Sequence, residues 1–169
     1  MSISPLVSQS HDTVDSRYCD MTTPFWQTKP LEQMTPEEWE SLCDGCGRCC
    51  LQKLEDEETG EVHNTSLACQ LLDIHSCRCS DYEHRKEKVP QCLKLTAGDI
   101  PHFHWLPDTC AYRLLAEGKP LFDWHPLISG NPDSVHLAGI SVRAFAQSET
   151  SVPEEDWEDY IIPMRPVES

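Results

Sequence analysis

The sequence predicts a small α+β, cysteine-rich domain that is stabilised by metal and has short helices, a β-hairpin and long loops. Its 169 residues suit a single domain. Hydrophobic residues make up only 38% of the chain, so its core must be thin. Ten cysteines accompany that thin core, and metal binding through them would add the stability that it lacks.

We expect three regions along the chain. Residues 1–23 are polar and aperiodic, which predicts a flexible N-terminal tail that includes Cys19. Residues 24–148 contain the other cysteines and form the predicted metal-binding domain. Residues 149–169 are predicted to be a mainly irregular C-terminal tail.

The segment TPEEWESLC carries a helix-start signature. Thr35 is the expected N-cap, a proline follows it, and Glu38 completes a capping box by reaching back to the amide of the cap residue. We therefore expect a helix over 36–43. Gly45 and Gly47 follow this helix and would end it, because glycine adopts the sharp turns that other residues avoid.

The next segment predicts a β-hairpin. Strands are expected at 51–54 and 61–67, joined by an acidic turn that ends at Gly60. A helical turn is expected within 68–77, followed by a charged loop that extends to residue 96.

The last third of the domain contains one clear helix signal. Asp108 is the expected N-cap of a helix whose end is marked by Gly118. Residues 123–132 are rich in proline and glycine and predict a loop, and 135–146 fit a strand or a short helix.

The charge balance excludes several classes of function. The chain has 29 acidic and 13 basic residues, a formal net charge of −16. This charge disfavours nucleic acids and anionic membrane surfaces as partners, while a protein partner stays open. The sequence has neither a membrane-length apolar run nor a secretory signal, so we expect a cytoplasmic protein with reduced thiols rather than disulfides.

The strongest motif is LCDGCGRCC at residues 42–50. It places two C-x-x-C steps in series, through Cys43, Cys46 and Cys49, with Cys50 directly after them. A C-x-x-C step brings two thiolates to one side of a turn, at the separation that a single metal ion needs. The motif therefore predicts a metal site.

The spacing leaves the metal open. Three cysteines at intervals of three residues, with a fourth elsewhere, are typical of iron–sulfur loops. A zinc site needs a second close group, which Cys77, Cys79 and Cys92 could supply. Adjacent side chains usually diverge, so we expect one of Cys49 and Cys50 to join the first site and the other to turn to a second ion or the core.

Catalytic motifs are absent from the sequence. It has no phosphate-binding or dinucleotide-binding glycine pattern and no nucleophile elbow, so we predict no catalytic and no organic cofactor-binding residues. Cys110 falls on the apolar side of its expected helix with Leu114, which favours a packing role over a ligand role.

The motif, together with Cys69, the CRCSDYEHR segment and VPQC, resembles the bacterial C-x-x-C-x-x-C-C family, described as a zinc- or iron-chelating domain, and in particular its small stand-alone, YcgN-like branch. The resemblance covers about residues 25–145. It implies metal-ligand roles for the four motif cysteines and for Cys69, Cys79 and Cys92. Lys86 stands where many members have a proline, which leaves the choice between Cys77 and Cys79 open.

We therefore predict a metal-binding protein that holds Zn²⁺ or an iron–sulfur cluster of the 4Fe-4S type. A non-enzymatic binding or sensing module is favoured. The alternative is an iron–sulfur oxidoreductase or electron carrier that works with an unidentified partner. The predicted ligands are Cys43, Cys46, Cys49, Cys50, Cys69, Cys77, Cys79 and Cys92.

Overall fold

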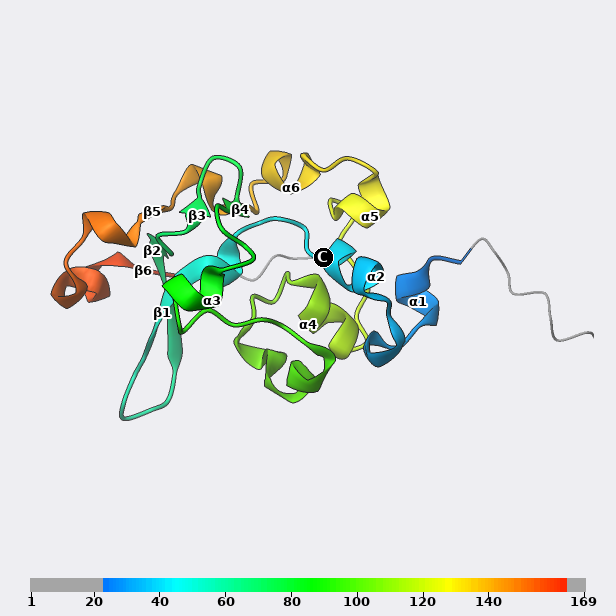
Figure 1. The fold of residues 1–169 in the computed structure, drawn as a ribbon, viewed down its shortest axis with the longest axis horizontal. Coiled ribbons are helices and arrows are strands. Elements are labelled where there is room, and N and C mark those ends of the chain that lie inside the picture. The colour runs from blue at the N-terminus through cyan, green and yellow to red at the C-terminus, as the bar shows by residue number, and fades with distance from the viewer. Residues whose placement is uncertain (1–22, 164–169) are drawn as a thin grey trace, which may run out of the picture.

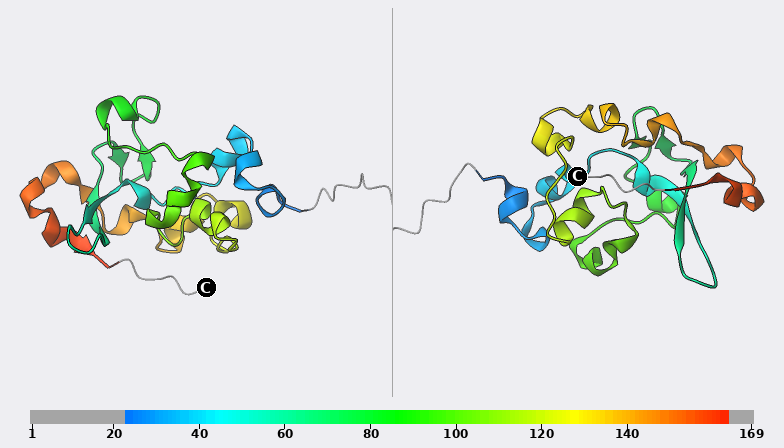
Figure 2. Two further views of the ribbon diagram at one scale, coloured as in Figure 1. Left: turned by 90° about the horizontal axis from the view of Figure 1, so that it is seen from below. Right: turned by 180° about the vertical axis from the view of Figure 1, so that it is seen from behind.

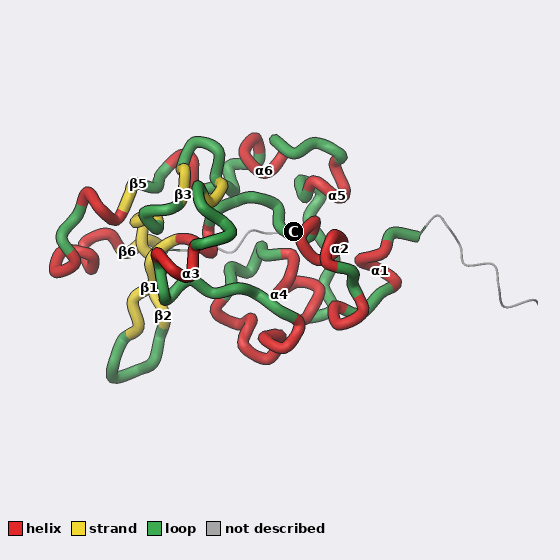
Figure 3. The backbone as a smooth tube through the Cα atoms, viewed as in Figure 1, coloured by secondary structure: helices red, strands yellow, loops and turns green. Residues whose placement is uncertain are grey.

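The structure is a computed structural model that describes residues 23–163. The strands lie toward one end of the molecule, together with α3 and the C-terminal helical turns, and α1, α2 and α5 lie toward the other end, with long loops between them (Figures 1 and 3). The described α-helices are α1 Phe25–Thr28, α2 Pro36–Ser41, α3 Arg85–Lys88, α4 Ala111–Ala116, α5 Pro126–Ser129 and α6 Ser134–Leu137. The strands are β1 Leu51–Glu55, β2 Val62–Ala68, β3 Leu72–Asp73, β4 Arg78–Cys79, β5 Gln147–Ser148 and β6 Ile161–Ile162. The predicted α+β class is confirmed.

Helix α2 begins as the sequence predicts. Glu38 N donates to Thr35 Oγ1 at 3.2 Å, and Thr35 N donates to Glu38 Oε2 at 2.9 Å, so both halves of the capping box form. The helix ends at Ser41 rather than at residue 43, because its last turn tightens and Cys43 N donates to Glu40 O. Cys43 therefore lies just beyond the helix, at the start of a loop.

The predicted hairpin is confirmed, and each strand end lies within one residue of its predicted position. Strands β1 and β2 pair antiparallel, and β2 also pairs with β5 in parallel and with β6 in antiparallel orientation. The acidic turn closes through a hydrogen bond of 2.7 Å from Gly60 N to Asp56 O. The right-hand view of Figure 2 shows the β1–β2 hairpin projecting from the sheet.

Residues 68–77 differ from the expected helical turn. Strands β3 and β4 form a second, two-stranded antiparallel sheet instead, with Leu72 opposite Cys79. The side chain of Asp73 closes the turn between them by accepting from His75 N and Ser76 N, at 2.9 and 3.2 Å. This local side-chain bonding competes with helix formation, and the sequence prediction did not account for it.

Helix α4 begins later than predicted. Its N-cap is Cys110, not Asp108, because Cys110 N donates to Pro107 O and closes a turn across the aspartate. The helix ends near Gly118 as expected, where Lys119 N donates to Leu114 O at 2.8 Å. The later start moves Cys110 from the predicted apolar helix face to the helix entrance.

The remaining segments are partly helical. The predicted loop over 123–132 contains α5, which starts where Leu127 N donates to His125 Nδ1 at 3.1 Å. Of the two forms predicted for 135–146, the structure has the short helix α6. Residues 149–163 consist of 3-10 turns followed by β6. The expected N-terminal tail, including Cys19, lies outside the described residues apart from Thr23.

Three apolar clusters hold the described chain together, and the two largest are a helical core and a sheet core. The helical core contains Leu42, Phe103 and Leu114, among others, with Trp39 packed against it. The sheet core contains Leu51, Ala68, Leu72, Cys77 and Val142. None of the helices between Thr23 and Pro163 is long and apolar enough to cross a membrane.

Gly47 occupies the tightest of the turns. Its φ is +75°, and a Cβ atom there would lie 2.8 Å from Val142 Cγ2 in the sheet core. We expect Gly47→Ala to lower the free energy of unfolding by about 2–4 kcal/mol, the sum of backbone strain and overpacking. Urea unfolding of the protein as purified measures this loss.

Gly139→Ala is the matched control. Gly139 has a similar φ of +70°, but a Cβ atom there meets nothing within 4 Å, so only the backbone cost of about 1–2 kcal/mol applies. Equal losses in the two variants would show that the contact with Val142 is not a constraint.

Candidate metal centre

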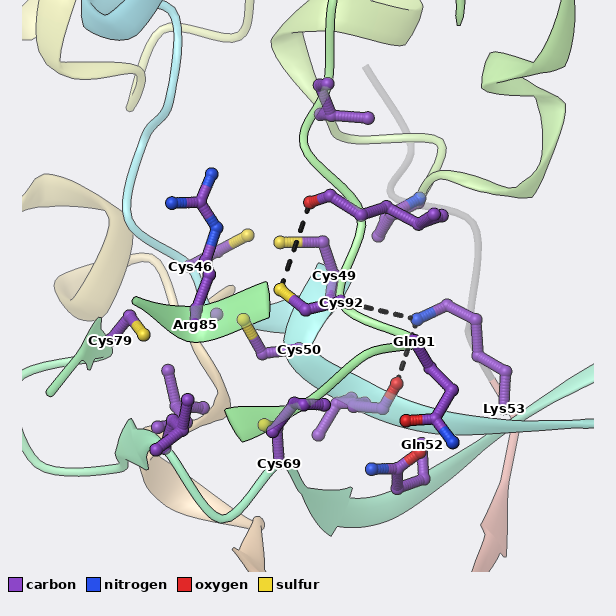
Figure 4. Close-up of a pocket in the computed structure, with 18 of the residues that line it drawn as sticks. Cys46, Cys49, Cys50, Gln52, Lys53, Cys69, Cys79, Arg85, Gln91 and Cys92 are labelled. Atoms are coloured by element: carbon purple, nitrogen blue, oxygen red, sulfur yellow. Dashed lines mark hydrogen bonds between the residues drawn. The ribbon is translucent and has the colours of Figure 1, made fainter. Parts of the chain in front are cut away.

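A pocket of about 1130 Å³ opens between the helical part and the sheet. Its wall includes residues of α2, the 43–50 loop, β1, β4, the segment 82–95 and the start of α4. We name it the cysteine pocket, because eight cysteines line it: Cys43, Cys46, Cys49, Cys50, Cys69, Cys79, Cys92 and Cys110. Figure 4 labels six of them.

The 43–50 loop is shaped by its short polar and glycine residues. Asp44 Oδ1 accepts from Cys46 N at 2.9 Å, which folds the first C-x-x-C step into a turn. Gly45 and Gly47 both have φ near +75°, and Cys50 N donates to Gly47 O at 3.0 Å. The loop thus passes through two left-handed turns that carry its cysteines along the wall of the pocket.

The loop is fixed from behind by the segment around α6. Cys46 is 8% exposed and packs against Val135 and Ile140. Val142 N donates to Cys46 O at 2.9 Å, and Arg48 Nε donates to Ile140 O at 2.6 Å. These contacts join residues almost a hundred positions apart, so no local sequence pattern could predict them.

The strands bring two further cysteines, Cys69 and Cys79, to the pocket beside Cys50. Cys69 N donates to Cys50 O at 2.9 Å at the end of the β1–β2 pair. Leu72 N donates to Cys69 O, and the β3–β4 pairing then sets Cys79 opposite Leu72. Backbone hydrogen bonds therefore fix the relative positions of Cys50, Cys69 and Cys79.

Cys77 and Cys79 have different environments. Cys77 is 4% exposed, belongs to the sheet core, and its Sγ donates to Ile74 O at 3.4 Å. It does not line the pocket, whereas Cys79 does. Seven of the eight predicted ligands thus converge on the pocket, and Cys77 is the one that lies apart.

Cys110 lines the pocket although it was not among the predicted ligands. It stands at the N-cap of α4 and lines the pocket, although its expected position suggested a packing role. The Pro107 turn that displaces the helix start was the sequence signal that could have identified it.

The thiols of the helical side differ in exposure: Cys46 is buried, Cys110 is half-buried and Cys43 is exposed. Burial raises the pKa of Cys43 to about 11 and that of Cys110 to about 12, and it raises the pKa of Cys46 well above its ordinary value. At neutral pH these thiols keep their protons unless a cation compensates the charge of the thiolate.

Cys49 is the exception among the motif thiols. A hydrogen bond from the Cys50 thiol, and then the charge of Lys53, lower the pKa of Cys49 to about 7. The same hydrogen bond raises the pKa of Cys50. Lys53 is held at the pocket by bonds from its Nζ to Cys49 O and Leu51 O, at 3.2 and 2.9 Å. Cys49 is therefore the motif thiol most readily ionised.

Asp44 brings a buried carboxylate oxygen without a hydrogen-bond partner to the pocket. The residue is 6% exposed, and its Oδ2 atom is buried without a hydrogen-bond partner. A buried carboxylate oxygen without a hydrogen-bond partner is costly, and a nearby cation reduces that cost. Thiolates beside a carboxylate are donors that suit zinc or iron, so the residues present fit such a metal.

Four basic groups also line the pocket of this acidic protein: Lys53, Arg78, Arg85 and Lys88. Arg78 lies over the 43–50 loop. Its Nη2 is 3.1 Å from the point where a Cβ atom on residue 45 would lie if Gly45 were replaced by alanine. Arg85 stacks 3.7 Å from the ring centroid of Tyr82. Such cations can offset the negative charge that several thiolates bring to one centre.

The pocket side chains do not form a coordination shell in this structure. Between residues 23 and 163, no three Cys, His, Asp or Glu side chains stand close enough together to hold one metal ion. None of the histidines in this range lines the pocket. The donors available there are therefore sulfur and carboxylate oxygen.

Comparison with known proteins fixes the family. A sequence family described as "Putative zinc- or iron-chelating domain", CxxCxxCC, matches residues 42–111, which span Cys43 to Cys110. A UPF0260 protein of Marinobacter nauticus is 64% identical over 139 residues, covering 82% of this chain and 94% of that protein. The chain belongs to the UPF0260 family.

Other members of the UPF0260 family give the same result. One from Proteus mirabilis is 58% identical over 142 residues, covering 84% of this chain and 95% of its own. One from Mesorhizobium japonicum is 57% identical over 148 residues, covering 86% of this chain and 100% of its own. The resemblance to the C-x-x-C-x-x-C-C family is thus confirmed, and no solved structure matches significantly.

Proposed function

We propose that this UPF0260 protein binds zinc or an iron–sulfur cluster through the thiolates of the cysteine pocket and acts as a non-enzymatic binding or sensing module. The observation that carries the proposal is the convergence of eight cysteines, from five separate places in the chain, on one pocket beside a buried carboxylate oxygen that has no hydrogen-bond partner. A bound metal would join the helical part to the sheet.

The composition of the pocket wall supports a binding role over thiol catalysis. A cysteine nucleophile needs a histidine or a similar base within reach, and among residues 23–163 the pocket-lining side chains include no histidine. Burial also raises the pKa of Cys43 and Cys110, so these thiols are poor nucleophiles without a metal.

An electron-carrying iron–sulfur protein is the second candidate. The observation that favours it is the number of thiols, because one structural zinc ion uses about four ligands and the pocket offers eight cysteines. Lys53, Arg78 and Arg85 would counter the negative charge of an anionic cluster.

Purification without oxygen separates the two candidates. We expect at least one metal ion per chain by elemental analysis. A colourless zinc protein would support the binding module. A brown protein that contains acid-labile sulfide and bleaches with dithionite would support the electron carrier. A chain free of zinc and iron after this preparation would refute both.

Cys46→Ser tests the ligand assignment. Cys46 is the middle cysteine of the two C-x-x-C steps and lines the pocket. Replacing its soft sulfur by a hydroxyl should weaken metal binding by at least about tenfold, and the purified variant should lose half or more of its metal.

Cys77→Ser is the matched control, because Cys77 is equally buried but faces the sheet core. It should keep its metal and lose about 1–3 kcal/mol of unfolding free energy, since a hydroxyl replaces a thiol in apolar surroundings. Metal loss in Cys77→Ser with full retention in Cys46→Ser would reverse the assignment.

A further inference from the structure

We propose that the cysteine pocket also binds a small organic acid, whose carboxylate or phosphate head group is held by Arg78 and Arg85. These two residues, which we name the arginine wall, belong to the segment that runs from β4 into α3, and both line the pocket. The proposal goes beyond metal binding, because it gives the pocket a second ligand of a different chemical class. It does not require the metal.

The pocket is larger than a metal centre needs. Its volume is about 1130 Å³, whereas pockets of about 300–1,000 Å³ hold whole small molecules. The thiols form only part of the wall, and the rest includes Trp39, Trp105 and Trp157 together with several leucines. An apolar wall of this kind can cover the body of a small molecule while a few polar groups fix its orientation.

The four basic groups of the pocket differ in how their charges are balanced. Lys88 Nζ lies 2.5 Å from Asp81 Oδ2 and forms an ion pair with it. Lys53 Nζ donates to two backbone carbonyl groups. Among residues 23–163, no carboxylate oxygen lies within 4.0 Å of the nitrogen atoms of Arg78 or Arg85. The arginine wall thus carries positive charge without a carboxylate partner, although acidic residues outnumber basic ones 29 to 13 in this protein.

Arg85 is buried and held in one orientation. The residue is 9% exposed, and its Cζ lies 3.7 Å from the ring centroid of Tyr82. Its Nη1 donates to Tyr82 O, and the side chain makes no other hydrogen bond within the described part of the chain. Figure 4 shows this side chain extending toward Cys46. A guanidinium has five N–H donors, so most of those of Arg85 are available to a ligand in the pocket.

Arg78 is placed beside the 43–50 loop by the absence of a side chain at Gly45. Its Nη2, Cζ and Nε lie 3.1, 3.2 and 3.6 Å from the point where a Cβ atom on residue 45 would lie. The glycine therefore provides the space that the guanidinium occupies. Unlike Arg48 and Arg85, Arg78 donates no hydrogen bond to any residue between 23 and 163. Its donors are free to bind an acceptor that enters the pocket.

The chemistry of the guanidinium group favours an oxyanion as the missing partner. A planar guanidinium forms two parallel hydrogen bonds with a carboxylate or a phosphate. A cysteine sulfur is only a weak acceptor, so metal-bound thiolates would balance the charge of the arginines and leave most of their donors unsatisfied. The tryptophans and leucines of the pocket then favour an acid with an apolar body over an inorganic ion.

Titration of the full-length protein, purified without oxygen, tests the proposal. The probes are benzoate and phenyl phosphate, which carry the two head groups on the same ring, and calorimetry measures their binding. We expect one molecule of the preferred acid to bind per chain at about millimolar concentration or below. Benzyl alcohol, which has the ring without the charge, should bind at least about tenfold more weakly. Inorganic phosphate, which lacks the ring, should bind about fivefold more weakly than phenyl phosphate.

Arg85→Lys distinguishes an oxyanion site from simple charge balance. Lysine keeps the charge but lacks the planar fork, so the affinity for the preferred acid should fall at least about fivefold. Arg78→Gln, at an exposed position, should weaken binding about tenfold. Lys86→Gln is the matched control, because Lys86 is exposed, adjoins Arg85 and does not line the pocket. The same loss of charge there should leave the affinity unchanged.

The proposal would be overturned if neither acid bound saturably, if benzyl alcohol bound as tightly as the acids, or if Arg85→Lys and Arg78→Gln both kept full affinity. Inorganic phosphate that bound as tightly as phenyl phosphate would overturn the assignment to an organic acid. Circular dichroism shows whether each variant is folded. If Arg85→Lys fails to fold, Arg78→Gln compared with Lys86→Gln decides the outcome.

Elemental analysis of the same samples separates this proposal from the proposed function. A protein that contains zinc or iron and binds neither acid would contradict the arginine wall alone. A protein that binds benzoate or phenyl phosphate and contains neither metal would contradict the metal-binding function alone.

Discussion

This structure depends on one constraint: cysteine thiols and the Asp44 carboxylate meet at the junction of the helical core and the sheet core. The helical core and the sheet core are separate clusters, and the cysteine pocket lies where the two parts meet. Thiols fill this junction in place of the apolar side chains that usually join a domain. Asp44 adds a buried, unpaired carboxylate oxygen there. A cation bound to these groups would relieve the charge and connect the two cores at once.

Other contacts across the junction depend on the same arrangement. Tyr82, in the segment that leads to Cys92, donates from Oη to Glu40 Oε2 of α2 at 3.1 Å, and Arg85 stacks on its ring. Arg48 and the backbone of Cys46 anchor the 43–50 loop to residues 140–142. Segments that are distant in the sequence thus meet at the pocket, and each of them contains a pocket cysteine or positions one.

The sequence predicted the features that rest on local chemistry. The Thr35 capping box, the β1–β2 hairpin and the convergence of the four motif cysteines all follow from residue types at short spacing, and the structure contains them. The features that depend on distant contacts were not predictable in this way. Asp73 closes a β-turn where a helical turn was expected, and the Pro107 turn moves Cys110 to the pocket. Cys77 and Cys79 are two residues apart in sequence, and only the β3–β4 pairing separates the core cysteine from the pocket cysteine.

The central claim is that the thiols of the cysteine pocket hold the metal. Alkylation with iodoacetamide, read by peptide mass spectrometry, tests it most directly on protein purified without oxygen. Our account predicts that the eight pocket thiols resist alkylation in the protein as purified and react after a strong chelator has removed the metal. Equal alkylation of these thiols before and after chelation would contradict it.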